Sequence, residues 1–256
     1  YPPPFSLMER RCLERAALLL TASDAVEQVL RAKGRRGPVA RLDHALDPSL
    51  FHPENGEARA GEEFTVGYFG RLTAAKGVDT LLRAVALLPE EQRPRVLLGG
   101  GGEAEADLRR LAEALGIAGR CRWLGAAPHL EMASCYRRVD LCVVPSRTTP
   151  TWKEQFGRVI IESLACEVPV AGSSSGHIPA LLQETGGGWV FPEGDEVALA
   201  ELLRQVAQHP EERRRRARQG REAVLARYTW EAVAQSLAEM LFRIVPQNKE
   251  REAWAR

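Results

Sequence analysis

No hydrophobic run in these 256 residues is long enough to cross a membrane, and the first residues do not resemble a signal peptide. A bilayer-spanning helix needs about 20 predominantly apolar residues, and a secretory signal needs a charged start followed by an apolar run. The sequence therefore predicts a cytoplasmic protein. It opens with YPPPF and not with a methionine, so we expect a piece of a longer polypeptide.

Metal-binding spacings of cysteine and histidine are also missing. None of the five cysteines forms a CxxC pair or a Cys/His cluster of the kind that holds zinc. Three of them lie inside apolar runs, where a free thiol behaves as a small hydrophobic group. We expect buried free thiols in a reducing compartment. The cysteines are Cys12, Cys121, Cys135, Cys142 and Cys166.

Neither sign of charge dominates the chain. With 35 Lys and Arg against 34 Asp and Glu, the net charge is +1, which gives no support to a nucleic-acid partner. The densest basic run, Arg213–Arg216, follows Glu211 and Glu212, and pairs between the acids and Arg215 and Arg216 at i, i+4 would stabilise a helix. We interpret this run as a solvent-exposed helix face, with contact to a membrane or RNA as the alternative.

The GxGxxG fingerprint of dinucleotide-binding proteins is absent. Gly99–Gly102 follows a strand-like run, but no acid stands at the end of the next one. The four glycines predict either a flexible turn or a turn that lies against a ligand.

From Phe64 onward, strand-like runs alternate with helix-like runs. Such alternation predicts an α/β fold with a Rossmann-like, doubly wound parallel sheet covered on both faces. The expected strands are residues 65–69, 96–98, 121–124, 141–144, 169–171 and 188–191. The expected helices between and after them are residues 76–88, 103–115, 130–138, one starting near 157, 178–184, 197–208, 211–227 and 230–245. Before Phe64 we expect a helix at 7–15, a strand within 16–22, a helix ending near 32, a short strand within 38–43 and then a loop.

The most informative stretch is residues 145–170, PSRTTPTWKEQFGRVIIESLACEVPV. Glu154 precedes a helix that is apolar on nearly all sides, and Glu162 lies in its narrow polar sector. Such a helix is buried, so the carboxylate at its edge needs a partner, which sugar hydroxyls would provide. The free N–H groups at the helix start favour an anion. Together these features indicate a nucleotide-sugar site.

A second constellation follows the first expected strand of the sheet, in residues 70–77, GRLTAAKG. Ligands of open α/β sheets bind beyond the carboxyl ends of the strands. Arg71 offers a two-pronged fork for phosphate and Lys76 a compact charge, so both cations are expected at one pyrophosphate. The alternative is a solvated basic loop.

The pattern E-x-F-G-x4-E followed by A-x-x-x-P-V resembles the donor-binding half of retaining GT-B glycosyltransferases, the GT4-like group 1. The resemblance implies a GT-B C-terminal domain with a remnant of the N-terminal domain. Residues 1–53 would be the tail of the acceptor domain and a linker, 54–230 the donor nucleotide-sugar-binding domain, and 231–256 a C-terminal helix that returns toward the N-terminal domain. Asp47–Pro53 is similar to the family's linker, with Ala45-Leu46 where Gly-Val is usual.

The resemblance implies a retaining transfer of a sugar from a nucleoside-diphosphate sugar to a carbohydrate or lipid-linked acceptor, in polysaccharide biosynthesis. It implies no metal cofactor, and the sequence has no D-x-D of the metal-dependent type. Peripheral membrane contact would come from the missing N-terminal domain. The isolated chain is expected to bind donor weakly and to transfer little. Two alternatives stay open, a non-catalytic nucleotide-sugar-binding module and a GT-B nucleotide-sugar 2-epimerase.

The family's functional residues match positions here one by one. Arg71 and Lys76 would bind the diphosphate and stabilise the leaving group, while Glu154 would orient the donor sugar and Glu162 would bind the ribose hydroxyls. The alternative is a purely structural role for each acid. Glu154 would then be an acid at a helix start, and Glu162 a partly buried salt-bridge partner. Positions expected to contact substrate mainly through backbone are Gly70, Gln155, Phe156 and Gly157, and also Gly125 and Ala126, on which the base would pack.

Three positions depart from the family pattern. Gln155 stands where glycine is common and is expected to narrow the sugar pocket. Glu167 replaces a glycine, so a turn that favours positive φ is expected to be either strained or differently shaped there. Ala180 replaces a glutamate in the turn after Gly176. His129 and His177 are interpreted as loop or cap residues.

Overall fold

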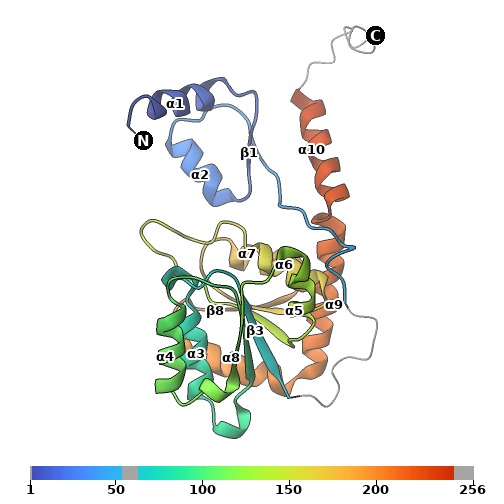
Figure 1. Cartoon of the computed structure of the whole chain (residues 1–256). Coiled ribbons are helices and arrows are strands. Elements are labelled where there is room, and N and C mark those ends of the chain that lie inside the picture. The colour runs from blue at the N-terminus through green and yellow to red at the C-terminus, as the bar shows by residue number, and fades with distance from the viewer. Residues whose placement is uncertain (1, 54–62, 245–256) are drawn as a thin grey trace. The chain divides into compact units, whose positions relative to one another are not determined.

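The computed structural model describes residues 2–53 and 63–244 (Figure 1). Contacts divide the chain at Ala45/Leu46 and at Thr229/Trp230 into two compact units. The larger unit is the middle of the chain and the smaller unit is formed by its two ends. This division puts residues 46–53 with the larger unit. The assignment of the units to domains of a longer protein stays a prediction.

The larger unit is built on a six-stranded parallel sheet in the order β5-β4-β3-β6-β7-β8. The chain runs from β3 outward through β4 to β5, then returns to β6 and runs outward the other way. The direction of winding therefore reverses between β3 and β6, which makes this the topological switch point of the sheet. The strands are β3 Thr65–Phe69, β4 Arg95–Gly99, β5 Cys121–Gly125, β6 Leu141–Val144, β7 Val170–Ser173 and β8 Gly188–Phe191.

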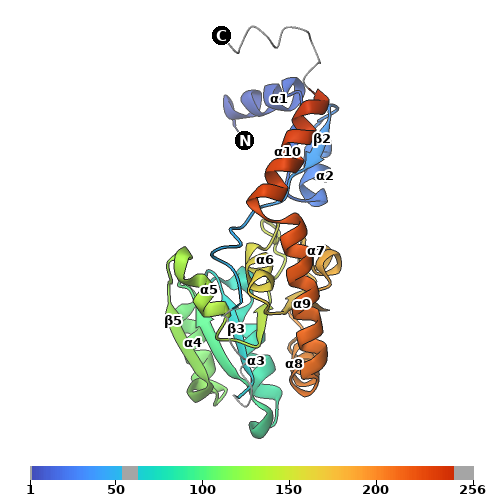
Figure 2. The ribbon, with the colours of Figure 1, turned by 90° about the vertical axis from the view of Figure 1, so that its right-hand side faces the viewer.

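Helices cover both faces of the sheet (Figures 1 and 2). The main apolar cluster lies between the sheet and α3 (Val78–Leu87), α4 (Glu105–Ala114) and α8 (Glu196–Gln208). The opposite face carries α5 (Met132–Tyr136), α6 (Arg158–Ala165) and α7 (Ile178–Thr185), and α9 (Pro210–Arg227) packs against α6 and α7. Single 3-10 turns lie at Ala74–Lys76, Glu90–Gln92, Ala118–Arg120 and His129–Glu131. The predicted α/β fold with a doubly wound parallel sheet is confirmed.

The smaller unit contains α1 (Phe5–Arg15), α2 (Asp24–Ala32) and α10 (Trp230–Ile244), with β1 (Leu19–Thr21) paired in parallel to β2 (Val39–Arg41). The buried Arg35 holds its loops together, because its guanidinium donates to the carbonyl oxygens of Leu13 at 2.7 Å and Pro38 at 2.8 Å. Parallel pairing of two short strands is what the sequence pattern of a helix between them predicts.

Element boundaries differ from the sequence predictions by a few residues, with two informative cases. The first helix of the sheet begins at Val78, because Gly77 has the left-handed φ of +65° and ends the preceding turn. The helix expected at 130–138 is a 3-10 turn followed by the five-residue α5. The predicted end of the last helix, Val245, lies outside the described residues.

The arginine run on α9 has two kinds of members. Arg214 and Arg215 are exposed and pair at i, i+3 with Glu211 and Glu212, as a solvated face requires. Of the two predicted i, i+4 pairs, Glu212–Arg216 is present at 2.8 Å. The interpretation as a solvent-exposed face is wrong for Arg213, whose guanidinium lies over the Phe64 ring and pairs with Asp140, and for Arg216, which donates to the Gly188 carbonyl oxygen at 2.7 Å and lies over Trp189.

The five cysteines are free thiols, and Cys135, Cys142 and Cys166 are buried as expected, while Cys12 is exposed. Among the helices of the described chain, none has the length and apolar character that a membrane span requires.

Candidate functional site

The loops that follow β3 and β6 meet beyond the carboxyl ends of these two neighbouring strands, at the switch point of the sheet. The two loops approach each other so closely that a Cβ on Gly77 would lie 2.0 Å from the Pro145 carbonyl oxygen. Only glycine fits this contact, and Gly77 also needs its positive φ. The Arg147 N–H then donates to the Ala75 carbonyl oxygen at 2.8 Å. The sequence thus fixes the turn that carries Lys76 against the loop that carries Glu154.

Arg71 lies on the loop after β3, which is held by backbone contacts to the four glycines. The N–H groups of Gly70 and Leu72 donate to the carbonyl oxygens of Gly99 and Gly101, each at 2.9 Å. A Cβ on Gly100 would lie 1.8 Å from the Gly70 carbonyl oxygen. A Cβ on Gly102 would likewise lie 2.2 Å from the Leu72 carbonyl oxygen, so close backbone packing explains the glycines at these two positions. The Arg71 side chain itself is exposed, and no acid pairs with it in the described part of the chain.

Lys76 and Glu154 form an ion pair, although they are 78 residues apart. Lys76 Nζ lies 2.6 Å from Glu154 Oε2, and the same oxygen accepts from Ser146 Oγ at 3.2 Å. Both side chains are largely buried, at 21% and 13% exposure. The other carboxylate oxygen, Oε1, meets no donor within residues 2–53 and 63–244. The indole of Trp152 covers the ammonium, 4.7 Å from ring centroid to Nζ.

Arg71 lies on the same loop as Lys76, after β3. The Tyr68 hydroxyl donates to the Arg71 carbonyl oxygen at 2.6 Å. Burial raises the pKa of this phenol, the Glu154 charge raises it further, and the Arg71 charge opposes both. The structure thus pairs Lys76 with Glu154, while the roles predicted for Arg71, Lys76 and Glu154 in donor binding stay predictions.

The residues between Glu154 and α6 are held by backbone contacts. The Glu154 carbonyl oxygen accepts from the His177 N–H at 2.9 Å, and Gly157, with φ of +84°, precedes the helix. The N–H groups of Gln155 and Gly157 meet no acceptor in the parts of the chain that are described, which leaves them available to an anion. The buried Phe156 side chain packs on the His177 ring, so only its backbone can contact a substrate.

Glu162 is 5% exposed on α6. Burial raises the pKa of its carboxyl, while a hydrogen bond from Tyr136 and the Arg158 charge oppose the rise. The Tyr136 hydroxyl donates to Oε2 at 2.8 Å, and Arg158 lies 3.3 Å from Oε1. The sequence argument expected a partner for this acid but did not identify Tyr136, which comes from α5. Spacing along the chain gives no signal for such a contact.

The loop after β5 begins at Gly125, which has φ of +70° and whose carbonyl oxygen accepts from the Gly100 N–H at 2.7 Å. The neighbouring Ala126 is exposed. Further along, the His129 ring lies 5.3 Å from the Phe51 ring, which lies 6.2 Å from the ring of Tyr136, the partner of Glu162. The base contact expected of Gly125 and Ala126 stays a prediction.

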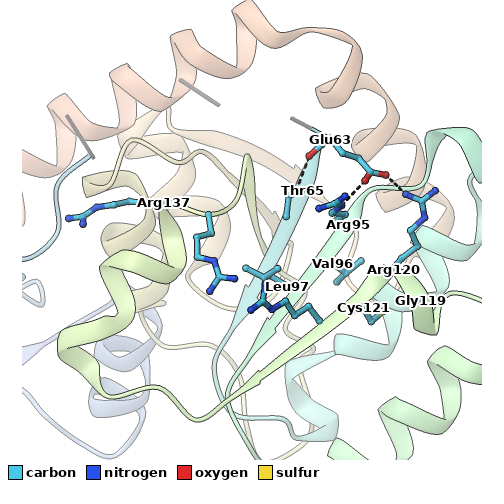
Figure 3. Close-up of a pocket in the computed structure, with 11 residues that line it drawn as sticks. Glu63, Thr65, Arg95, Val96, Leu97, Gly119, Arg120, Cys121 and Arg137 are labelled. Carbon is cyan, nitrogen blue, oxygen red and sulfur yellow. Dashed lines mark hydrogen bonds and ion pairs between the residues drawn. The ribbon is translucent and has the colours of Figure 1, made fainter. Parts of the chain in front are cut away.

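A cavity of about 670 Å³ lies elsewhere, at the amino ends of β3, β4 and β5 (Figure 3). None of the predicted site residues lines it. Three of the arginines that line it are occupied, because Arg95 and Arg120 pair with Glu63 and Arg137 donates to the His52 carbonyl oxygen at 2.8 Å. Since ligands of doubly wound sheets bind at the carboxyl ends of strands, we place the candidate site at the switch point and not in this cavity.

A family profile and a curated protein that match this sequence are both described as glycosyltransferases. The sequence profile described as glycosyl transferases group 1 matches residues 54–223. D-inositol 3-phosphate glycosyltransferase of Mycobacterium tuberculosis is 31% identical over an alignment 272 residues long. The alignment covers 98% of this chain and 54% of that protein. The chain thus spans about half the length of the curated relatives it matches.

Solved structures give the same picture. Sucrose-phosphate synthase from Thermosynechococcus elongatus superimposes with a TM-score of 0.78 at 29% identity, covering 95% of this chain and 62% of that one. The Anabaena protein HepE, solved in complex with UDP-glucose, superimposes with a TM-score of 0.80 at 22% identity, covering 93% and 66%. The second likeness shows the fold alone.

Proposed function

Because this chain belongs to the group 1 glycosyltransferases of GT-B fold, we propose that it is the donor-binding half of a retaining glycosyltransferase that uses a nucleoside-diphosphate sugar. The observation that carries the proposal is the ion pair of Lys76 with Glu154 at the switch point of the sheet, where the loop that carries Lys76 also carries Arg71. Cations for a diphosphate beside a carboxylate for hydroxyls match the two halves of such a donor.

In the proposed reaction, the bond between the anomeric carbon and the diphosphate oxygen breaks as the acceptor oxygen bonds to the same face of that carbon. The departing diphosphate takes the proton of the acceptor hydroxyl. Negative charge develops on the diphosphate, and Arg71 and Lys76 would stabilise it from fixed positions. These two cations supply the positive charge, so the proposal includes no metal ion.

Glu154 and Glu162 would orient the donor. The open Oε1 of Glu154 would accept from a hydroxyl of the sugar, while the N–H groups of Gln155 and Gly157 bind its phosphate side. Glu162, held by Tyr136, would accept from the ribose hydroxyls. The loop at Gly125 and Ala126 would pack on the base.

The test is a calorimetric titration of UDP, GDP and ADP against the wild type, Arg71→Ala and the control Arg83→Ala. Arg83 is an exposed arginine on α3 and lies outside the proposed site. A charge-assisted hydrogen bond is worth about 1.5–3 kcal/mol, and about 1.4 kcal/mol is tenfold in affinity. We expect Arg71→Ala to weaken diphosphate binding roughly tenfold or more and Arg83→Ala to have no effect. Equal affinities for all three proteins would refute the site.

The acceptor side of the proposal concerns a longer protein. In the GT-B arrangement that the sequence resembles, the acceptor is bound by the N-terminal half, of which this chain would hold only a remnant. We therefore propose that the chain alone binds donor and transfers little, and that supplying an N-terminal half restores transfer to a carbohydrate or lipid-linked acceptor. Rapid transfer by the chain alone would contradict this part of the proposal.

A further inference from the structure

The segment between Ser146 and Glu154 is fastened to the body of the larger unit. Arg147 Nη2 donates to Asp79 Oδ2 at 2.8 Å and to Thr80 Oγ1 at 2.6 Å, at the start of α3. Thr148 Oγ1 donates to Glu193 Oε2 at 2.9 Å and lies 3.0 Å from Ser175 Oγ. Contacts to three separate parts of the chain fix the direction in which the segment continues.

A tight turn then places Trp152 beside the ion pair. The N–H of Thr149 donates to the Trp152 carbonyl oxygen at 2.7 Å, and the Trp152 N–H donates back to Thr149 Oγ1 at 3.0 Å. The half-buried indole projects from this turn over Lys76 Nζ, at 4.7 Å from the ring centroid. Within residues 2–53 and 63–244, the Trp152 indole belongs to no buried apolar cluster and makes no hydrogen bond, so neither explains why a tryptophan should stand here.

The two partners of Lys76 differ in one respect that matters for a diphosphate. Glu154 holds the ammonium at 2.6 Å but neutralises its charge. The indole attracts the ammonium through the negative face of its ring and carries no net charge. It can therefore restrain a flexible lysine, whose stem has about 2 kcal/mol of rotamer entropy, while leaving the positive charge available to a phosphate.

We propose that Trp152 is a positioning residue of the donor site, which holds the Lys76 ammonium where the sugar-bearing phosphate of the donor binds. The inference rests on the proposed function, because it assigns Lys76 to the diphosphate. Substitution of Trp152 should therefore change the affinity for a nucleoside diphosphate or its sugar ester. It should not change the affinity for a nucleoside monophosphate, which lacks that phosphate.

The test compares Trp152→Phe, Trp152→Leu and Trp152→Met in the intact chain, each with and without Lys76→Met. Affinities are measured by calorimetry for the diphosphate among UDP, GDP and ADP that binds the wild type most tightly, and for the matching monophosphate. Because cation–π attraction is strongest for tryptophan, smaller for phenylalanine and absent for aliphatic groups, we expect diphosphate affinity to fall about 3- to 10-fold in the Leu and Met variants. The Phe variant should stay within about 3-fold.

The monophosphate affinity should be unchanged in all three variants, and in the Lys76→Met background none of the Trp152 substitutions should change diphosphate affinity further. A loss that is equal for monophosphate and diphosphate, or that persists without Lys76, would overturn the inference, since Trp152 would then act through shape. If Arg71→Ala weakens diphosphate binding and the Trp152 variants do not, only this inference fails. If the wild type binds no diphosphate, the proposed function fails with it.

Discussion

Lys76 and Glu154 neutralise each other in the proposed site. The carboxylate oxygen that holds Lys76 also accepts from Ser146, so this oxygen is occupied twice while Oε1 is open. A nucleoside diphosphate must therefore compete with Glu154 for the ammonium. The same carboxylate would then assist the sugar and oppose the bare diphosphate.

Substitution of Glu154 should therefore change the affinity for a nucleoside diphosphate and the affinity for its sugar ester in different directions. Glu154→Gln keeps the shape but removes a negative charge 2.6 Å from Lys76. Since a partly exposed ion pair is worth about 0–1 kcal/mol, we expect the nucleoside diphosphate to bind about 2- to 5-fold more tightly to the variant. The sugar ester should lose affinity relative to the diphosphate. Calorimetry with both ligands checks this, and weaker binding of both would show that Glu154 supports the phosphate instead.

Glu162 gives a prediction about pH. Burial raises the pKa of its carboxyl in the folded protein above the ordinary value of 4.5, so the folded state holds this proton more tightly than the unfolded state. The contribution of the group to stability is then fully present below pH 4.5 and is lost as the pH rises through the folded pKa.

Glu162→Gln removes this dependence. We expect the wild type to gain unfolding free energy relative to the variant when the pH is lowered from 7.5 to 4.5, as measured by urea unfolding at both values. A difference between the two proteins that stays constant over this range would contradict the raised pKa.

At the scale of elements, the end of α6 carries a conformational cost. The N–H of Val168 donates to the Ser163 carbonyl oxygen and that of Glu167 to the Leu164 carbonyl oxygen, which is the Schellman pattern with Glu167 at the left-handed position. Glu167 has φ of +60°. The positive φ expected from the sequence at this position is confirmed. The turn lies at the end of α6 remote from Glu154.

Glycine at this position should therefore stabilise the protein. The left-handed conformation costs a side-chain-bearing residue about 1–2 kcal/mol, and glycine loses about 0.5–1 kcal/mol more backbone entropy on folding. We expect Glu167→Gly to raise the unfolding free energy by about 0.5–1 kcal/mol in urea unfolding. Glu167→Ala keeps the strain and removes the charge, so it should give no such gain. Equal gains in both variants would assign the effect to charge.

The arginine run of α9 gives a matched pair. Arg213 is 17% exposed, pairs with Asp140 and lies over Phe64, whereas Arg214 is 43% exposed and pairs with Glu211 on its own helix. We expect Arg213→Met to lower the unfolding free energy by about 1–2 kcal/mol, because Asp140 is left partly buried without its charge partner. Arg214→Met should change it by less than about 0.5 kcal/mol. Equal effects in urea unfolding would mean that the Asp140 pair carries no stability.

These elements also show what the sequence could and could not predict. Alternation of strand-like and helix-like runs predicts a parallel sheet, and the rule that its strands carry ligands at their carboxyl ends predicts the meeting of Lys76 with Glu154. Tyr136 and Trp152 escaped prediction, because their partners lie on other elements and the contacts depend on how short segments turn. The inward packing of Arg213 could not be predicted for the same reason. Helical spacing predicts pairs between residues of α9, but it does not predict contacts between α9 and the sheet.

At the scale of the whole molecule, the chain spans about half the length of its curated relatives. The six-stranded unit nevertheless contains the residues proposed for the donor. We therefore expect this chain alone to bind the donor, and we expect transfer of the sugar to require a longer protein.

The most direct measurement is a crystal structure of the chain soaked with the nucleoside-diphosphate sugar that it binds most tightly. The account predicts the diphosphate within hydrogen-bond distance of Arg71 and Lys76, a sugar hydroxyl on Glu154 and the ribose on Glu162. A donor found in the arginine-lined cavity at the opposite ends of the strands (Figure 3), with the switch point empty, would contradict it.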